Sequence, residues 1–349
     1  MTKISGKPEI IKKINTNLVK KAIIENAPIT KPQLSKMLNL SLPTINKTVE
    51  ELLLIGEVRK CENKIEVKGS GKKPVFYEVN GDSITSIIVY FKNNFLYMKE
   101  YNILSEIKNE KKYHINKDFE IEKFLNILNK MYNESKNKEN IRSISIGIPG
   151  EIEKNGCISG AYTLTNFNGI NLQKIIEEKY NIEVKIENDV NLIAIGLLEK
   201  VPSDIKNLVY LFLGEGIGTG ILIDKKLYKG KSNFAGEIGE ILLFDGKTIE
   251  EKYKLTIESN NKEEIKRIIL FILTINISIL NPDIIIINSS IYKITKKIFD
   301  EILKKLKEKF GENNIPEIYL DEKDLENGIE GTLKMASFKN KDNLSIIDK

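Results

Sequence analysis

The most informative stretch of this chain lies between residues 186 and 240. It reads IENDVNLIAIGLLEK at 186–200, YLFLGEGIGTGILIDKKLYKG at 210–230 and NFAGEIGE at 233–240. Its centre is an apolar run that enters a series of alternating glycines and leaves through a second apolar run. This pattern predicts a buried hairpin whose backbone approaches another group very closely. Glycines of this kind serve phosphate binding and tight packing alike, so the pattern leaves both interpretations open.

Polar side chains stand beside this hairpin at positions suited to binding. Asn188 and Asp189 follow a short β pattern and precede an apolar helical run. We therefore expect both at a strand-to-helix junction, where α/β proteins place ligand-binding groups. Glu237 adds a carboxylate between two glycines, in the segment Ala-Gly-Glu-Ile-Gly.

The order of these motifs resembles that of the ROK family of sugar kinases and sugar-responsive repressors. ENDVN, GxGIGxGI, LYKG and AGEIG are separated motifs that occur in the family's order and spacing. The resemblance implies an α/β, two-lobed body of the actin-like and hexokinase-like (ribonuclease H-like) ATPase type. It also implies sugar contacts from Asn188, Asp189, Glu237 and Glu251, with Asp189 at the position of the kinase's catalytic base. Glu240, which replaces a family histidine that touches both sugar and metal, is a further candidate for ligand binding.

The first 80 residues carry the pattern of a helix-turn-helix. Apolar residues over 10–26 have helical spacing. Thr30 and Gln33 form a capping-box start for a short second helix, and Ser41 is a suitable N-cap for a third helix over 42–55. A packing helix followed by two helices joined by a brief turn is the helix-turn-helix plan.

A wing and a basic segment are expected after the third helix. Residues 57–59 and 64–67 predict its two strands, and the glycine-rich, basic segment 68–74 can lie along phosphates or enter the minor groove. The arrangement resembles the winged-helix head of ROK repressors, with Lys where the family's Gly-Gly-Arg-Pro hook has Arg. The candidate DNA-binding residues are Ser41, Pro43, Thr44, Asn46, Lys47, Thr48, Lys68, Gly71, Lys72 and Lys73. A solvated helix face and a lysine-rich linker are the alternatives.

Composition is consistent with a protein that binds nucleic acid through one end. Residues 1–80 hold 15 Lys and Arg against 8 Asp and Glu, whereas the remainder holds 39 against 41. An excess of positive charge in one domain is typical of nucleic-acid binding. No apolar run approaches the ~20 residues that span a bilayer, and the N-terminus lacks a signal-peptide core. We therefore expect a cytoplasmic protein with no membrane partner.

The predicted domains follow from the change of pattern near residue 82. Residues 1–80 form the winged helix-turn-helix, and residues 81–349 form the kinase-like body. Its first lobe is expected at about 81–154 together with the C-terminal helix 326–339, and its second lobe at about 155–325. The elements expected in the body are strands at 83–91, 95–101, 141–146 and 284–287 and helices at 120–134, 190–198, 266–280 and 291–310.

The features that bind nucleotide in the family are replaced in this chain. The family's first phosphate loop, Asp-x-Gly-Gly-Thr, should lie within 87–94, which reads IIVYFKNN. Glu215 stands in the second phosphate loop where Thr is usual, and Asn-Ser-Ser at 288–290 replaces three glycines of the adenosine loop. Three replacements around one ligand predict that ATP is not bound.

The family's zinc ligands are replaced as well. Glu240 stands for the histidine, and apolar side chains, which we expect to pack where the metal would hold the loop, occupy the cysteine region: Leu242, Phe244 and Ile249. Cys61 and Cys157 are the only cysteines, and their spacing suits neither a zinc site nor a disulfide framework. The sequence therefore predicts no metal and no cofactor.

These observations predict a sugar-responsive, DNA-binding transcriptional regulator, most simply a repressor, without enzymatic activity. Its expected partners are double-stranded operator DNA, a sugar or sugar derivative as effector, and further copies of itself in a dimer or tetramer. Two alternatives stay open: an ATP-dependent sugar kinase, which would use Asp189, and a ligand-free oligomerisation module on a DNA-binding head. The sequence identifies neither the effector nor the operator, and it is compatible with repression and with activation.

Overall fold

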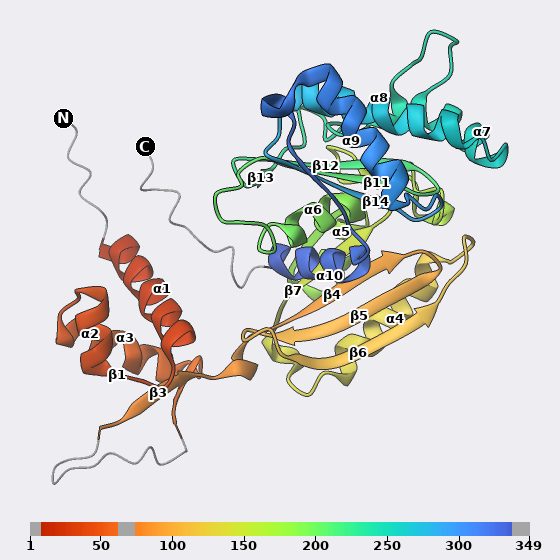
Figure 1. The fold of residues 1–349 in the computed structure, drawn as a ribbon. Coiled ribbons are helices and arrows are strands. Elements are labelled where there is room, and N and C mark those ends of the chain that lie inside the picture. Colours follow the sequence, from red (N-terminus) through yellow and green to blue (C-terminus); the bar gives the residue numbers. More distant parts are fainter. Residues whose placement is uncertain (1–7, 62–73, 337–349) are drawn as a thin grey trace.

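The computed structural model describes residues 8–61 and 74–336, which form a small head and a larger body (Figure 1). The head contains the helices α1 (Pro8–Asn26), α2 (Lys31–Leu38) and α3 (Leu42–Leu54) and a sheet of the strands β1 (Ile29–Thr30), β3 (Phe76–Val79) and β2 (Val58–Lys60), in that order. The capping box at α2 is confirmed, because Thr30 and Gln33 each accept a hydrogen bond from the other's backbone N–H. Ser41 caps α3 as predicted.

The head sheet differs from the expected wing in the partner of its first strand. β2 pairs antiparallel with β3, whose residues were not predicted as a strand. The predicted strand at 64–67 lies outside the described residues, and so do Lys68, Gly71, Lys72 and Lys73. The head core is formed by one face of each helix together with the inner side chains of the sheet.

The first lobe of the body is a five-stranded mixed sheet. Its strands lie in the order β10 (Glu183–Asn188), β7 (Ile141–Ile148), β4 (Thr85–Lys92), β5 (Phe95–Asn102) and β6 (Ile107–His114). The helices α4 (Ile121–Glu134) and α5 (Leu172–Tyr180) share its apolar core. β6 is a polar edge strand, which the sequence analysis did not predict.

The second lobe is built on another five-stranded sheet. Its strands lie in the order β13 (Lys226–Leu227), β12 (Ile217–Ile223), β11 (Leu208–Leu213), β14 (Ile284–Ser289) and β15 (Glu317–Leu320). One core cluster joins this sheet to the helices α7 (Ile249–Glu258), α8 (Lys262–Leu280) and α9 (Lys296–Phe310). A separate cluster joins it to α6 (Asp189–Leu197). Successive side chains of β11 and of β14 therefore point alternately into the two clusters. Both faces of these strands are buried, which explains why their sequences are continuously apolar.

Short elements complete the body. They are the hairpin β8 (Glu151–Ile152) and β9 (Ile158–Ser159), and the 3₁₀ turns η1 (Gly81–Ser83), η2 (Lys138–Asn140), η3 (Thr165–Phe167), η4 (Ile238–Glu240) and η5 (Glu312–Asn314). The last helix, α10 (Asp324–Met335), returns to the first lobe and contacts β4 and β7.

The boundary between the lobes lies later in the chain than predicted. β10 pairs in parallel with β7, from Glu183 opposite Ser143 to Asn188 opposite Ile148. Residues up to Asn188 therefore belong to the first sheet, and the expected start of the second lobe at about 155 is wrong. A parallel pair needs a long crossover, and the segment that holds α5 is that crossover rather than the start of a new lobe.

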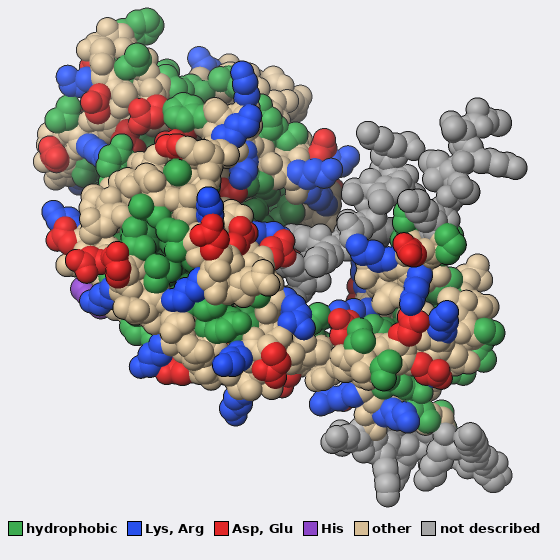
Figure 2. All heavy atoms as spheres, turned by 180° about the vertical axis from the view of Figure 1, so that it is seen from behind, with side chains coloured by type: hydrophobic (Ala, Val, Ile, Leu, Met, Phe, Trp, Pro, Cys, Tyr) green, Lys and Arg blue, Asp and Glu red, His purple; other side chains and the backbone are tan. Residues whose placement is uncertain are grey.

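Charged side chains of both signs are interspersed over the head and the body on the face drawn in Figure 2. Within the head, two ion pairs join Lys12 to Glu51 at 2.9 Å and Lys31 to Glu50 at 3.3 Å. No helix in the described ranges has the length and apolar character needed to cross a membrane.

Candidate functional sites

Asn188 and Asp189 lie where the sequence predicted them, at the junction between β10 and α6. The Asn188 Oδ1 atom accepts a hydrogen bond from the Asn191 backbone N–H at 3.0 Å and so caps α6. Its Nδ2 atom donates to the Gly150 carbonyl oxygen at 2.9 Å, which ties the helix start to the segment after β7. Burial raises the pKa of Asp189, and the positive charge of Lys92 opposes this rise.

The glycine-rich hairpin formed by β11 and β12 approaches α6 rather than open space. A Cβ atom on Gly218 would lie 2.8 Å from Val190 Cγ2, and one on Gly220 would lie 2.8 Å from Ala194 Cβ. The packing interpretation therefore holds for these two glycines. The turn before them is different: the Ile217 backbone N–H donates to Glu250 Oε2 at 2.8 Å. The backbone N–H at the end of this turn is thus already hydrogen-bonded to the Glu250 carboxylate of the chain itself.

Glu237 lies in a group of carboxylates. Burial raises its pKa from 4.5 to about 7, and the negative charges of Glu151, Glu240 and Glu250 add to the rise. Burial also raises the pKa of Glu151, with Glu240 contributing. This part of the body is consequently rich in hydrogen-bond acceptors, and at neutral pH Glu237 is present both as a carboxylic acid and as a carboxylate.

Glu251 does not join this group. Its Oε2 atom accepts a hydrogen bond from the Thr248 backbone N–H at 2.8 Å, in a capping box that begins α7. The carboxylate directed at the glycine-rich turn belongs to Glu250, which the sequence analysis did not select. The Thr-x-x-Glu pattern at 248–251 was the signal that could have separated the two, because it places Glu251 at the helix start.

A buried ion pair occupies the end of β4, where the resemblance places a phosphate loop. The Lys92 ammonium lies 2.7 Å from Asp324 Oδ2 of α10 and 4.4 Å from the centre of the Phe212 ring of β11. Lys92 is 8% exposed. Beside it, the buried ring of Tyr90 lies so close to Gly147 and Gly328 that a Cβ atom on either would clash with it. The sequence showed that the loop was replaced, but not what filled its place.

The segment expected to hold apolar side chains in place of zinc is only partly buried. Ile249 packs in the core, as predicted. Leu242 and Phe244 are exposed, so the prediction is wrong for them. The segment is closed instead by backbone pairing of Leu242 with Thr248, which needs no apolar filling. Glu240 is exposed, and within residues 8–61 and 74–336 no group of three or more His, Cys, Asp or Glu side chains could hold a metal ion.

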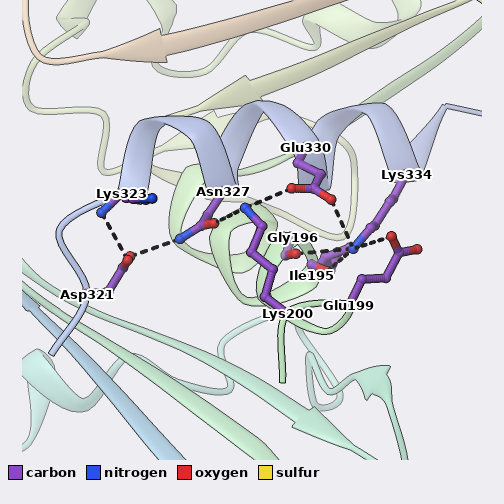
Figure 3. A network of polar contacts seen from close by, with 9 residues as sticks. All are labelled: Ile195, Gly196, Glu199, Lys200, Asp321, Lys323, Asn327, Glu330 and Lys334. Carbon is purple, nitrogen blue, oxygen red and sulfur yellow. Dashed lines mark hydrogen bonds and ion pairs between the residues drawn. The ribbon is translucent and has the colours of Figure 1, made fainter. Parts of the chain in front are cut away.

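The two lobes meet where α6 crosses α10 (Figure 3). A Cβ atom on Gly196 would lie 1.9 Å from the Asn327 carbonyl oxygen, so the backbones are nearly in contact. Two lysines lie beside the crossing, one in α10 and one just after α6. Lys334 of α10 donates to the carbonyl oxygens of Ile195 and Gly196 at 3.2 and 3.1 Å, and Lys200, just after α6, lies 2.8 Å from Glu330.

The exposed face of α3 is narrower than predicted. Thr48 is buried, because it lies one helical turn from Ile45 on the inner face, so it is not available to DNA. Pro43, Asn46 and Lys47 do line a shallow surface groove. Ser41 and Thr44 stand at the helix start, where their hydroxyl oxygens are 2.8 Å apart.

The chain resembles known regulators in sequence and in fold. The ROK family model matches residues 100–252. A xylose repressor of Caldicellulosiruptor bescii is 32% identical over 67% of this chain and 60% of its own length. The structure of a ROK family transcriptional regulator, a homologue of the E. coli MLC protein, superposes with a TM-score of 0.66 at 17% identity and covers 93% of this chain and 96% of that chain.

A sugar kinase matches over a shorter region of the chain. A glucokinase of Halalkalibacterium halodurans is 34% identical over 30% of this chain and 32% of its own length. The match to the xylose repressor is more extensive, although it spans only about three fifths of that relative.

Proposed function

We propose that this chain, a member of the ROK family, is a sugar-responsive, DNA-binding transcriptional regulator, most simply a repressor. The proposal rests on one observation: the chain combines a head that contains a capped helix-turn-helix with a kinase-like body. Relatives named xylose repressors support it. We assign residues 1–80 to the winged helix-turn-helix and residues 81–349 to the body.

The DNA-binding face consists of the start of α3 and the segment after β2. Pro43, Asn46 and Lys47 border a surface groove, and Lys47 forms no ion pair with another described residue. Asn reaches base edges and Lys reaches phosphates, so these side chains suit the major groove. Lys68, Gly71, Lys72 and Lys73, which lie outside the described residues, are proposed as further DNA contacts. Two heads in a homodimer would read two half-sites.

The effector site is the region around the start of α6 and η4. Asn188, Asp189, Glu237 and Glu250 supply carboxylate and amide oxygens, which are suited to the hydroxyl groups of a sugar. Glu250 takes the role that the resemblance had suggested for Glu251, because it is the one directed at the glycine-rich turn. Effector binding would favour one arrangement of the lobes and thereby change the spacing of the heads on DNA.

Two contacts support the proposal that ATP is not bound. The Lys92–Asp324 pair fills the end of β4, and Glu250 accepts the hydrogen bond of the Ile217 N–H. In a nucleotide site those positions would be left for phosphate groups. Here they are satisfied by the chain itself, so phosphate would have to displace internal contacts.

An ATP-dependent sugar kinase is the second candidate. It is favoured by Asp189 at the position of the catalytic base and by the matching glucokinase segment. The general base of such an enzyme must be ionised to accept a proton, and burial raises the pKa of Asp189. Release of ADP in the presence of ATP, magnesium and D-xylose or D-glucose would establish this candidate in place of the regulator.

Thermal unfolding of the full chain tests the proposal. The ligands are D-xylose, D-glucose, N-acetyl-D-glucosamine, their phosphates, and ATP with magnesium. A ligand at ~100 times its dissociation constant adds roughly 2.7 kcal/mol to the free energy of unfolding. We expect a rise in Tm with one sugar and none with ATP. A rise with ATP would favour the kinase, and no rise with any ligand would favour an oligomerisation module without effector.

Two variants locate the site. Asp189→Asn should abolish the sugar-dependent rise in Tm, since it replaces a carboxylate acceptor by an amide. Glu251→Gln is the matched control: its side chain caps α7 outside the proposed site, so the rise should persist. Loss of the rise in the Glu251 variant alone would place the effector elsewhere.

A further inference from the structure

The head is joined to the body by more than the covalent chain. Only residues 80–84 separate the last head strand, β3, from the first body strand, β4. A second segment, the turn between β5 and β6 at residues 103–106, lies against the same junction. Domains joined by a short linker move relative to one another unless a hydrophobic interface prevents it, so the contacts of this turn decide how the head is held.

Ile103 belongs to the body by its place in the chain but to the head by its packing. It is 7% exposed and is part of the hydrophobic core that includes Val58, Tyr77 and Val79 of the head sheet. Ile84 of the linker packs against the same core. Leu104, the next residue of the turn, is 42% exposed. Among the described residues, Ile103 is thus the side chain from beyond the linker that is buried in the core of the head.

Asn102 holds this turn in shape. Its fully buried side chain accepts hydrogen bonds from the backbone N–H groups of Leu104 and Glu106, both at 3.0 Å. Its Nδ2 atom donates to Glu106 Oε2 at 2.8 Å and to Asp82 Oδ1 at 3.3 Å. Asp82, in the linker, also pairs with Lys108 of β6 at 2.8 Å. The turn and the linker therefore share one polar network.

The linker is fastened at both ends. Asn80 donates to carbonyl oxygens of the head, through its backbone N–H to Glu57 and through Nδ2 to Gly56, both at 2.9 Å. On the body side, Asn140 Nδ2 donates to the Asp82 carbonyl oxygen at 2.8 Å. The segment behaves as part of the structure on either side of it and not as a flexible tether.

The two strands that reach this joint, β4 and β5, extend between it and the proposed effector site. β4 and β5 are eight residues each, which corresponds to roughly 25 Å at about 3.3 Å per residue. Lys92 and Phe95 mark the end near α6 and α10, whereas Thr85 and Asn102 mark the end near the head. The first sheet thus extends from the proposed effector site to the junction with the DNA-binding head.

We propose that the β5–β6 turn locks the head to the first lobe, with Ile103 and Asn102 as the positioning residues, so that head and lobe move as one rigid body. Because of this lock, a change in lobe closure would displace the head on DNA without passing through a flexible linker. This second part rests on the proposed function, whereas the lock itself does not.

The two native cysteines allow the lock to be tested in the full chain. Cys61 lies in the head and Cys157 in the body, and both are partly exposed and free. Spin labels on both report the distribution of head-to-body distances, and dilution with unlabelled protein removes distances between copies. We expect one narrow distribution in the wild type, a broad one in Ile103→Ala, and a narrow one in the control Leu104→Ala. A broad distribution in the wild type, or a narrow one in Ile103→Ala, would overturn the proposal.

A further pair of variants covers the case in which Ile103→Ala does not fold. Ile103→Val removes one methyl group from the side chain that is buried in the head core, and Asp82→Asn removes the ion pair with Lys108. Each should broaden the distribution relative to the control while circular dichroism stays unchanged. Unaltered distributions in both variants would contradict the lock.

A separate experiment tests whether the lock transmits sugar binding to the DNA-binding head. Fluorescence anisotropy measures binding of the full chain to a double-stranded DNA site selected in vitro by the wild type, with and without D-xylose. Ile103→Ala should keep its affinity for DNA and for D-xylose but lose most of the sugar-dependent change in DNA affinity. Coupling equal to that of the wild type would refute this consequence. Failure of the wild type to bind DNA, or to bind any sugar of the thermal-unfolding panel, would count against the proposed function, and the spin-label distances would still decide the lock.

Discussion

Glu237 is the side chain whose protonation state should be visible in the stability of the protein. Its pKa rises from 4.5 to about 7 in the folded state, because burial and neighbouring carboxylates disfavour the charged form. The folded state therefore holds this proton more tightly than the unfolded state, and its contribution to stability is lost as pH rises from about 4.5 to about 7. At about 1.4 kcal/mol per pKa unit, the loss is at most about 3.5 kcal/mol.

Glu237→Gln should remove this pH dependence. The free energy of unfolding of the variant minus that of the wild type, measured in urea, should increase between pH 4.5 and 7 and level off above pH 7. Other titrating groups cancel in the difference. A difference that stays constant with pH would show that folding does not raise the pKa of Glu237.

Lys92 should be the lysine of the body whose loss costs most. Lys92→Met leaves Asp324 without its partner in a poorly solvated position, and breaking such a pair costs roughly 3 kcal/mol. The double variant Lys92→Met/Asp324→Asn should recover most of this loss, since no uncompensated charge remains. Lys99→Met is the control: its partner Glu110 is largely exposed, so the change should stay below about 1 kcal/mol. Equal losses at both lysines, measured by chemical denaturation, would contradict the argument.

Among the elements, those with strong periodicity or explicit capping residues were predictable from the sequence. The capping box at α2 and the N-cap of α3 were found because their side-chain chemistry is local. β6 was missed because its inward positions are polar, so the alternation that marks a strand is absent. Glu250 was missed for a related reason: helix phase decides which of two adjacent carboxylates faces inward, and only the start of α7 sets that phase.

The crossing of α6 and α10 should be intolerant of a single added methyl group. Alanine at position 196 would place its Cβ 1.9 Å from the Asn327 carbonyl oxygen, so the helices must separate. We expect Gly196→Ala to lower the free energy of unfolding by about 3 kcal/mol or more, because overpacking outweighs the gain of roughly 1 kcal/mol in helix propensity. Glu326→Ala, on the exposed side of α10, should change it by less than about 0.5 kcal/mol. A stabilised Gly196 variant would mean that the crossing can relax.

For the whole molecule, family resemblance predicted the body's architecture, whereas the boundary between the lobes needed the structure. A parallel strand such as β10 is joined to its partner through a crossover segment. Its own sequence does not show which strand it will pair with. The ion pair between Lys92 and Asp324 at the end of β4 could not be predicted for the same reason, since it joins residues more than two hundred positions apart.

The uneven charge of the chain predicts how DNA binding should respond to salt. The head carries the whole positive excess, and Lys12 and Lys31 form ion pairs with the acidic residues Glu51 and Glu50 of α3. The logarithm of DNA affinity should therefore fall linearly with the logarithm of salt concentration, by about 0.9 for each phosphate contacted. Lys47→Ala should reduce this slope by about one for each copy bound, whereas Lys304→Ala, an exposed lysine of the body, should leave it unchanged. Affinity that does not depend on salt, or an equal effect of both variants in anisotropy titrations, would argue against binding through the head.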